Sequence, residues 1–140
     1  VGFVFQFHFL LPSMNCIDNM LLPAKIGGCK TKEVKKRILD LAKRLGVDHC
    51  LEKYPFEISG GEQQRINIIR AISLKPKILL CDEPTGNLDS KTSLEIMQLF
   101  DEIHDKGNTV IMVTHEEEVA QHARRVIRLR DGMIESDKLN

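Results

Sequence analysis

The sequence lacks several features that would have pointed to a definite class of protein. It has no tryptophan, one tyrosine, and four cysteines scattered along the chain without a CxxC pair. Such spacing favours a reduced chain over a disulfide framework or a zinc site. Acidic and basic residues number 20 each, so no excess of positive charge favours nucleic acid as a partner. The longest apolar stretch, VGFVFQFHFLLP, is too short to span a bilayer and has no basic flank of a signal peptide.

A glycine-rich phosphate-binding loop, GxxxxGK followed by Ser or Thr, is also missing from residues 1–140. The segment Gly27-Gly28-Cys29-Lys30-Thr31 has some of its letters. Its lysine does not directly follow a glycine, however, and no apolar strand leads into it, so we do not expect it to bind phosphate. Because the chain opens at Val1 on a strand-like run, we expect it to start within a larger fold.

What is present indicates a globular chain, with 42% hydrophobic and 29% charged residues. Continuous apolar runs predict buried strands at 1–5, 77–83 and 108–115, and residues 124–131 predict a further strand, with Asp131-Gly132 turning into a final hairpin strand. Helical spacing predicts helices over 31–45, 59–73, 91–106 and 116–122, and residues 12–29 are predicted to be short helical turns and loop. Thr31 and Ser59 are the expected N-caps, and Leu94 is expected on the apolar side of its helix.

The alternation of strands and helices after residue 74 predicts a parallel α/β sheet. The mostly helical segment before it reads as an insertion on that sheet. We therefore divide the chain into a core strand and loop (1–12), a helical subdomain (13–73) and an α/β core (74–140).

Two acids, Asp82 and Glu83, follow the apolar run ILLC and so lie at the carboxyl end of a predicted strand. Open α/β sheets bind ligands at this edge, and in phosphate-transferring enzymes such acids hold Mg²⁺ or polarise the attacking water. A pair of acids that merely faces solvent is the alternative. The next predicted strand ends at His115, which the parallel arrangement places beside these acids, where it can hydrogen-bond a phosphate or water.

The stretch Ser59-Gly60-Gly61-Glu62 at a helix start admits two interpretations. Ser59 and Glu62 have the spacing of a capping box, which leaves the glycines unexplained. Alternatively, the free N–H groups of the helix N-terminus form an anion site, and the missing side chains let a phosphate approach the backbone. The two interpretations are compatible, provided that the Glu62 carboxylate turns into the cap.

The motifs FVFQ, ISGGEQQR, ILLCDEPTGNLD and VTH, in this order and at these intervals, resemble the ATP-binding subunit of ABC transporters. The resemblance covers essentially the whole chain, and DNMLLP with EPTGNLDSKT is most similar to the lipoprotein-releasing and macrolide-export branch. It implies the C-terminal portion of a P-loop NTPase-type parallel sheet with a helical ABC subdomain inserted. The family's N-terminal part, which carries the GxxxxGK loop known as Walker A, is absent from residues 1–140. Asn67 and Ile69 stand where the family usually has smaller residues.

The resemblance also implies roles for individual residues. Gln6 corresponds to the Gln-loop residue near Mg²⁺, Asp82 to the Walker B aspartate on Mg²⁺, and Glu83 to the catalytic glutamate. His115 corresponds to the switch histidine. Signature residues that bind ATP held by the other subunit are Ser59, Gly60 and Gly61, and the D-loop at the dimer interface includes Leu88 and Asp89.

The implied protein hydrolyses ATP with Mg²⁺ as a head-to-tail dimer. It lies on the cytoplasmic face of the membrane and drives a transmembrane permease, which residues near 7–30 contact. A non-transport ABC ATPase of the DNA-repair type is the first alternative, although neutral charge and the absence of coiled-coil heptads argue against it. The other is a non-catalytic binding module, and we expect the isolated 140 residues to be inactive.

Overall fold

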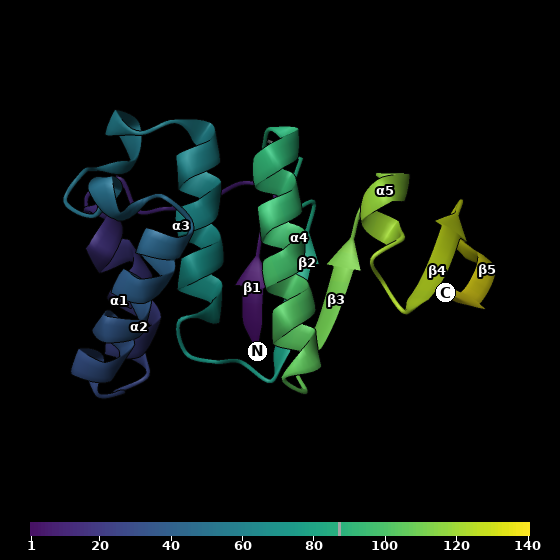
Figure 1. Ribbon diagram of the computed structural model, residues 1–140, viewed down its shortest axis with the longest axis horizontal. Helices are drawn as coiled ribbons and strands as arrows, with labels where there is room; N and C mark the ends of the chain where they lie inside the picture. Colours follow the sequence, from purple (N-terminus) through teal and green to yellow (C-terminus); the bar gives the residue numbers. More distant parts are fainter. Residues whose placement is uncertain (87) are drawn as a thin grey trace.

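The computed structural model of the chain describes residues 1–86 and 88–140; Asn87, within the ILLCDEPTGNLD motif, lies outside the described residues. The strands are β1 (Gly2–Val4), β2 (Ile78–Asp82), β3 (Thr109–Val113), β4 (Arg125–Arg130) and β5 (Met133–Leu139). The helices are α1 (Cys16–Ile26), α2 (Thr31–Arg44), α3 (Gly60–Ile72), α4 (Ser90–Asp105) and α5 (Glu117–Ala120), with 3₁₀ turns η1 (Asp48–Cys50) and η2 (Pro55–Glu57). In Figure 1 the sheet and α4 lie between the α1–α3 group and the β4–β5 hairpin.

Strands β1, β2 and β3 form a parallel sheet in that order, as the alternation of strands and helices predicts. Val4 is in register with Cys81, and Cys81 with Met112. Because the strands are parallel, their C-terminal ends meet at one side of the sheet, which we call the carboxyl edge. It carries Phe5-Gln6, Asp82-Glu83 and Thr114-His115.

Among the described residues, helices cover one face of this sheet and leave the other bare. Leu79 and Cys81 of β2 are buried, and α3 contacts β1 while α4 contacts β3. The prediction of fully buried strands is wrong for the other face, where Ile78 is 39% exposed, Ile111 52% and Val113 60%. Successive side chains of a strand point to opposite faces, so an apolar run buries only the residues whose face is covered.

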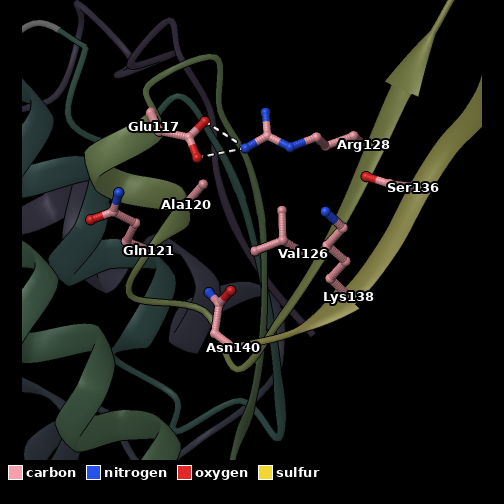
Figure 2. A pocket seen from close by; sticks show the side chains of 8 residues that line it. All are labelled: Glu117, Ala120, Gln121, Val126, Arg128, Ser136, Lys138 and Asn140. Atoms are coloured by element: carbon pink, nitrogen blue, oxygen red, sulfur yellow. Dashed lines mark hydrogen bonds and ion pairs between the residues drawn. The ribbon is translucent and has the colours of Figure 1, made fainter.

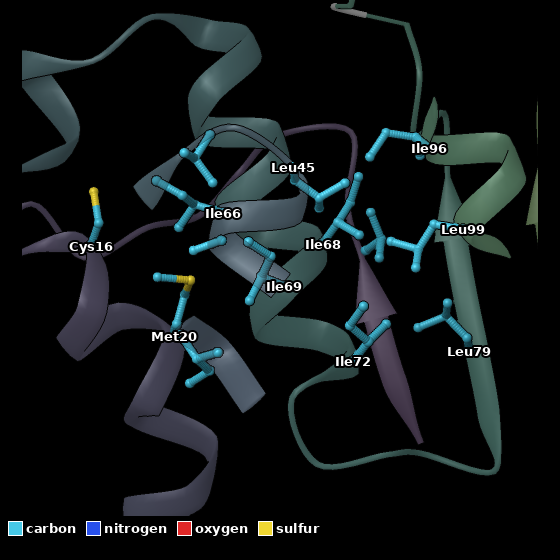
Figure 3. Close-up of a cluster of buried hydrophobic side chains, with 14 of the residues drawn as sticks. Cys16, Met20, Leu45, Ile66, Ile68, Ile69, Ile72, Leu79, Ile96 and Leu99 are labelled. Carbon is cyan, nitrogen blue, oxygen red and sulfur yellow. The ribbon is translucent and has the colours of Figure 1, made fainter. Parts of the chain in front are cut away.

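Helix α3 is the centre of the core (Figure 3). Its predicted inward residues Ile66, Ile69 and Ile72 are buried, and Ile68 is fully buried as well. Since apolar side chains leave α3 on more than one side, the helix packs against α1 and α2 as well as against β1. The ribbon view agrees with this central position (Figure 1).

Some local predictions are wrong. Residues 16–26 form one continuous helix, α1, rather than short helical turns and loop, although Pro23 lies inside the helix. The Asn15 side chain accepts the N–H of Asp18 and so caps α1, and burial of residues such as Met20 and Ala24 against the other helices holds it.

Two further predictions, each about a single residue, are also wrong. Lys30, not Thr31, is the N-cap of α2, and it makes no side-chain capping bond. Leu94 is 52% exposed although helical spacing placed it with buried Met97 and Phe100. The face of α4 that carries Leu94 has no covering element among the described residues.

The predicted final hairpin is confirmed, but it forms a separate antiparallel sheet, β4–β5. Asp131 (φ 49°) and Gly132 (φ 77°) both have positive φ, which a two-residue type I′ turn requires. Across residues 1–86 and 88–140, no helix is long and apolar enough to cross a membrane.

Candidate functional site

The Glu83 carboxylate is fixed at the carboxyl edge by the residues that follow β3. Its Oε1 accepts the backbone N–H of His115 at 3.0 Å and lies 2.7 Å from Nδ1 of the same residue. Its Oε2 accepts only a long bond of 3.4 Å from Thr114 Oγ1. The predicted proximity of His115 to the acids is therefore present, and Oε2 is the carboxylate oxygen with more capacity to accept another bond.

The backbone of Glu83 is strained in a way that aims this carboxylate. Its φ is 44°, in the left-handed region that a residue with a side chain seldom adopts, while its N–H donates to Val113 O at 2.9 Å. Backbone strain of this kind persists only where surrounding contacts impose it, and it is frequent at functional sites.

The His115 side chain is 81% exposed, whereas that of Glu83 is 12% exposed. The hydrogen bond to Glu83, and then its negative charge, raise the pKa of His115 above 6.5. With Nδ1 directed at Glu83, the other ring nitrogen, Nε2, is free to meet a ligand in solvent.

Gln6, which follows β1, and Asp82, at the end of the neighbouring strand β2, lie at the same edge. Gln6 is exposed two residues after Val4, and Asp82 is the exposed last residue of β2. In the part of the chain that the structure describes, neither side chain has a hydrogen-bond partner. Both offer oxygen atoms, which are the ligands that Mg²⁺ prefers.

The start of α3 is the capping box that the sequence predicts. Ser59 Oγ accepts the Glu62 N–H at 3.3 Å, and Glu62 Oε2 accepts the Ser59 N–H at 2.8 Å. Hydrogen bonds from the Ser59 backbone and side chain lower the pKa of Glu62 to about 2. The Glu62 carboxylate is thus turned into the cap, as expected.

The cap does not explain Gly60. A Cβ added there would meet no atom within 4 Å, and Gly60 is not among the residues with positive φ. Neither crowding nor backbone conformation therefore requires glycine at this position. The space beside Gly60 is open to a ligand or a partner from outside this chain. Among the described residues, no hydrogen bond or ion pair joins Ser59–Gly61 to Glu83 or His115, so these residues form two separate groups.

A row of polar side chains on α3 connects the helix to the carboxyl edge. Gln64 and Asn67, both almost fully buried, lie three residues apart. Gln64 Nε2 donates to Pro84 O at 2.9 Å, one residue after Glu83, and Asn67 Nδ2 donates to Phe5 O at 3.1 Å, one residue before Gln6. Asn67 Nδ2 also lies 3.3 Å from Gln64 Oε1.

Arg70 extends this row by three more residues. It donates to Asn67 Oδ1, to His8 O and to Phe9 O, each at 2.8 Å. Phe9 has a φ of 44°, so the guanidinium group holds a strained segment of the loop after β1. We name Gln64, Asn67 and Arg70 the α3 polar row. From the sequence, Asn67 stood out only as larger than the usual residue at its position, and Gln64 and Arg70 were not predicted, although the i, i+3, i+6 spacing of the three was a usable signal.

Asp89 is the N-cap of α4. Its side chain accepts the Thr92 N–H at 3.1 Å and the Thr92 hydroxyl at 2.6 Å, and these bonds lower its pKa. A groove of about 530 Å³ lies beside this helix, with Gly86, Leu94 and His115 in its wall. His115 therefore borders both Glu83 and an open groove.

A second pocket, of about 100 Å³, lies between α5 and the hairpin (Figure 2). Arg128 donates to both oxygens of Glu117 across it, at 2.5 and 2.7 Å. None of the predicted site residues lines this pocket, so we place no chemistry there.

The parallel sheet with a helical insertion and acids at its carboxyl edge defines the P-loop NTPase class of α/β fold. A family profile described as "ABC transporter" matches residues 1–86. The chain is 49% identical to the macrolide export ATP-binding/permease protein MacB of Chlorobium luteolum, covering 98% of this chain and 20% of that protein. It is 46% identical to the lipoprotein-releasing system ATP-binding protein LolD of Geobacter metallireducens, covering 98% and 61%.

The structure is similar to a bacterial ABC transporter cassette solved as a dimer, with a TM-score of 0.91 and 39% identity, over 99% of this chain and 62% of that one. A post-hydrolysis form of that cassette, bound to ADP and Pi, gives a TM-score of 0.90 at 38% identity, again over 99% and 62%. The chain belongs to the ABC transporter family, and it spans one fifth to about three fifths of these relatives.

The α3 polar row yields a stability prediction. Asn67→Ala removes a buried amide that donates to Phe5 O and accepts one of the three Arg70 bonds, so the free energy of unfolding should fall by about 1–3 kcal/mol. Gln98→Ala, at an exposed site on α4, should change it by less than about 0.5 kcal/mol. Chemical denaturation measures both; equal effects would contradict the structural role of the row.

The His115–Glu83 pair yields a titration prediction. NMR titration should give a pKa for His115 above 6.5, returning toward 6.5 in Glu83→Gln and unchanged in the exposed control Glu95→Gln. Because the folded-state pKa is the higher one, the pair stabilises the fold fully below 6.5, and this contribution is lost as pH rises through the raised value. An unshifted wild-type His115 would show that the pair does not form.

Proposed function

We propose that this chain is part of an ABC transporter subunit that binds and hydrolyses ATP as a head-to-tail dimer and powers export or release of a substrate through a membrane partner. The observation that carries the proposal is the Glu83 carboxylate, held by His115 at the edge where open parallel sheets bind ligands. The resemblance to an ADP- and Pi-bound cassette supports ATP as the substrate.

In this proposal Glu83 orients and polarises the attacking water. Oε1 is occupied by the two bonds from His115, so Oε2 is the oxygen that accepts a water proton. The carboxylate is only 12% exposed and its backbone is constrained, which limits reorientation before the reaction.

His115 completes the site by contacting the γ-phosphate through Nε2. A phosphate oxygen needs a donor, and Nε2 carries a proton together with Nδ1 only in the charged imidazolium. The raised pKa of His115 favours that form. Glu83 therefore prepares the histidine as a phosphate ligand as well as binding the water.

Gln6 and Asp82 fit a Mg²⁺ site because they bring an amide and a carboxylate oxygen to adjacent strand ends. A bound Mg²⁺ would neutralise phosphate charge during transfer. The phosphate cradle with the GxxxxGK motif is absent from residues 1–140, so we propose that these residues alone hydrolyse no ATP.

The second half of the site comes from a dimer partner. Ser59, Gly60 and Gly61 would bind the γ-phosphate of ATP held by the partner subunit, and the open space at Gly60 supports this. Asp89, in the D-loop, would lie at the dimer interface. The dimeric form of the similar cassette supports the same assembly.

The membrane partner is proposed to contact the segment near 7–30. Phe7, Phe9 and Ile26 are 69%, 65% and 79% exposed there, and exposed apolar groups of this kind mark interaction sites. The relatives include an ATP-binding/permease protein, which supports a permease as that partner and a place at the cytoplasmic face of the membrane.

Glu83→Gln tests the catalytic assignment. In the full-length protein it should lower ATP turnover by about 10²–10⁴-fold, because the amide cannot accept the water proton, while ATP binding persists. Glu95→Gln should keep wild-type turnover in a phosphate-release assay. Wild-type turnover of Glu83→Gln would overturn the assignment.

Gly60→Ala separates function from folding. The added methyl group meets no atom of this chain, so the free energy of unfolding should stay the same or rise by up to about 1 kcal/mol. Blocking one charge-assisted bond to phosphate should weaken ATP-dependent dimerisation by roughly 10–100-fold. Sedimentation in the Glu83→Gln background, with and without ATP, measures this; unimpaired dimerisation would refute the signature role.

A further inference from the structure

Three side chains with metal-binding atoms converge beside the first turn of α3. His49 and Cys50 come from η1, and Glu62 comes from α3. One ligand atom from each lies within 4.8 Å of the other two. His49 Nε2 is 2.8 Å from Glu62 Oε1, and Cys50 Sγ is 3.5 Å from the same oxygen. The ATPase chemistry proposed above uses neither His49 nor Cys50.

The two oxygens of Glu62 have separate partners. Oε2 accepts the Ser59 N–H and the Ser59 hydroxyl, both at 2.8 Å, and so belongs to the helix cap. Oε1 faces His49 and Cys50. An ion could therefore bind Oε1 while the cap of α3 stays in place.

We propose that His49, Cys50 and Glu62 form a binding site for a borderline-soft divalent transition-metal ion such as Zn²⁺, with water as the fourth ligand. Imidazole, thiolate and carboxylate are the three ligand types that zinc takes in proteins. Tetrahedral zinc with those bond lengths separates its ligand atoms by about 3.3–3.7 Å. The observed separations of 2.8 and 3.5 Å need only small side-chain adjustments to reach this range.

The environment of the three groups suits such an ion. His49 is 55% exposed, which leaves an entry path and room for the ring to move, whereas the Glu62 side chain is 19% exposed. Cys50 is fully buried. Burial and then the Glu62 bond raise the pKa of the Cys50 thiol to about 11, so the ion must displace the thiol proton into solvent as the sulfur–metal bond forms. Hard ions such as Mg²⁺ prefer oxygen ligands and do not match this set.

Spacing in the sequence gave no zinc signal, because adjacent His49-Cys50 is not a CxxC pair and Glu62 lies 12 residues beyond Cys50. The 3₁₀ turn and the start of α3 bring these residues together. The site is independent of the proposed ATPase reaction, since it requires neither nucleotide nor a second subunit.

Cobalt spectroscopy tests the site. Co²⁺ titrated into the reduced full-length protein, without nucleotide, should give visible bands of tetrahedral Co²⁺ and a near-ultraviolet thiolate-to-cobalt band at one equivalent. Zn²⁺ should abolish both. Cys50→Ser should remove the thiolate band, and His49→Ala, at an exposed site, should weaken Co²⁺ binding on the order of 10–100-fold.

Cys29→Ser is the matched control, because Cys29 is an exposed free thiol outside the cluster, and it should leave the cobalt spectrum unchanged. A wild-type protein without the thiolate band, or a band that persists in Cys50→Ser, would overturn the proposal. Undiminished Co²⁺ affinity in His49→Ala would do the same, because that exposed variant is expected to keep its fold.

Discussion

The buried amide of Asn67 is the contact on which the arrangement of the carboxyl edge depends. It donates to Phe5 O, receives Arg70, and lies beside Gln64, which holds Pro84 O. Helix α3 is thereby bonded to Phe5 O, one residue before Gln6, and to Pro84 O, one residue after Glu83. Buried polar groups are expensive to leave unpaired, so these bonds form together and fix α3 against both loops.

The α3 polar row lies in a chain whose two groups of proposed functional residues are apart from each other. Glu83 and His115 are assembled within this chain, whereas Gly60 faces open space. In the proposed dimer, phosphate would bind at the start of α3. The α3 polar row joins the same helix to the loop after β1.

The Glu62 carboxylate has a comparable double role at the other end of α3. One oxygen closes the cap, and the other meets His49 and Cys50, the residues of the proposed metal site. Much apolar surface is exposed among the described residues, on the sheet face with Ile111 and Val113 and at Phe7 and Phe9. This agrees with a chain that covers only part of its relatives.

The sequence by itself determined the Ser59–Glu62 cap and the Asp131-Gly132 turn, which rest on residues within a few positions of one another. It also determined the three strands, from their apolar runs, and their parallel arrangement with the acids and histidine at one edge, from the alternation of strands with helices. Only the tertiary structure decided that residues 16–26 form a helix, that Leu94 is exposed, and that one sheet face is bare. It also decided that Asn67 and Arg70 hold the loop after β1, about sixty residues away. The physical reason is that burial and long-range hydrogen bonds depend on which elements meet, and local spacing does not contain that information.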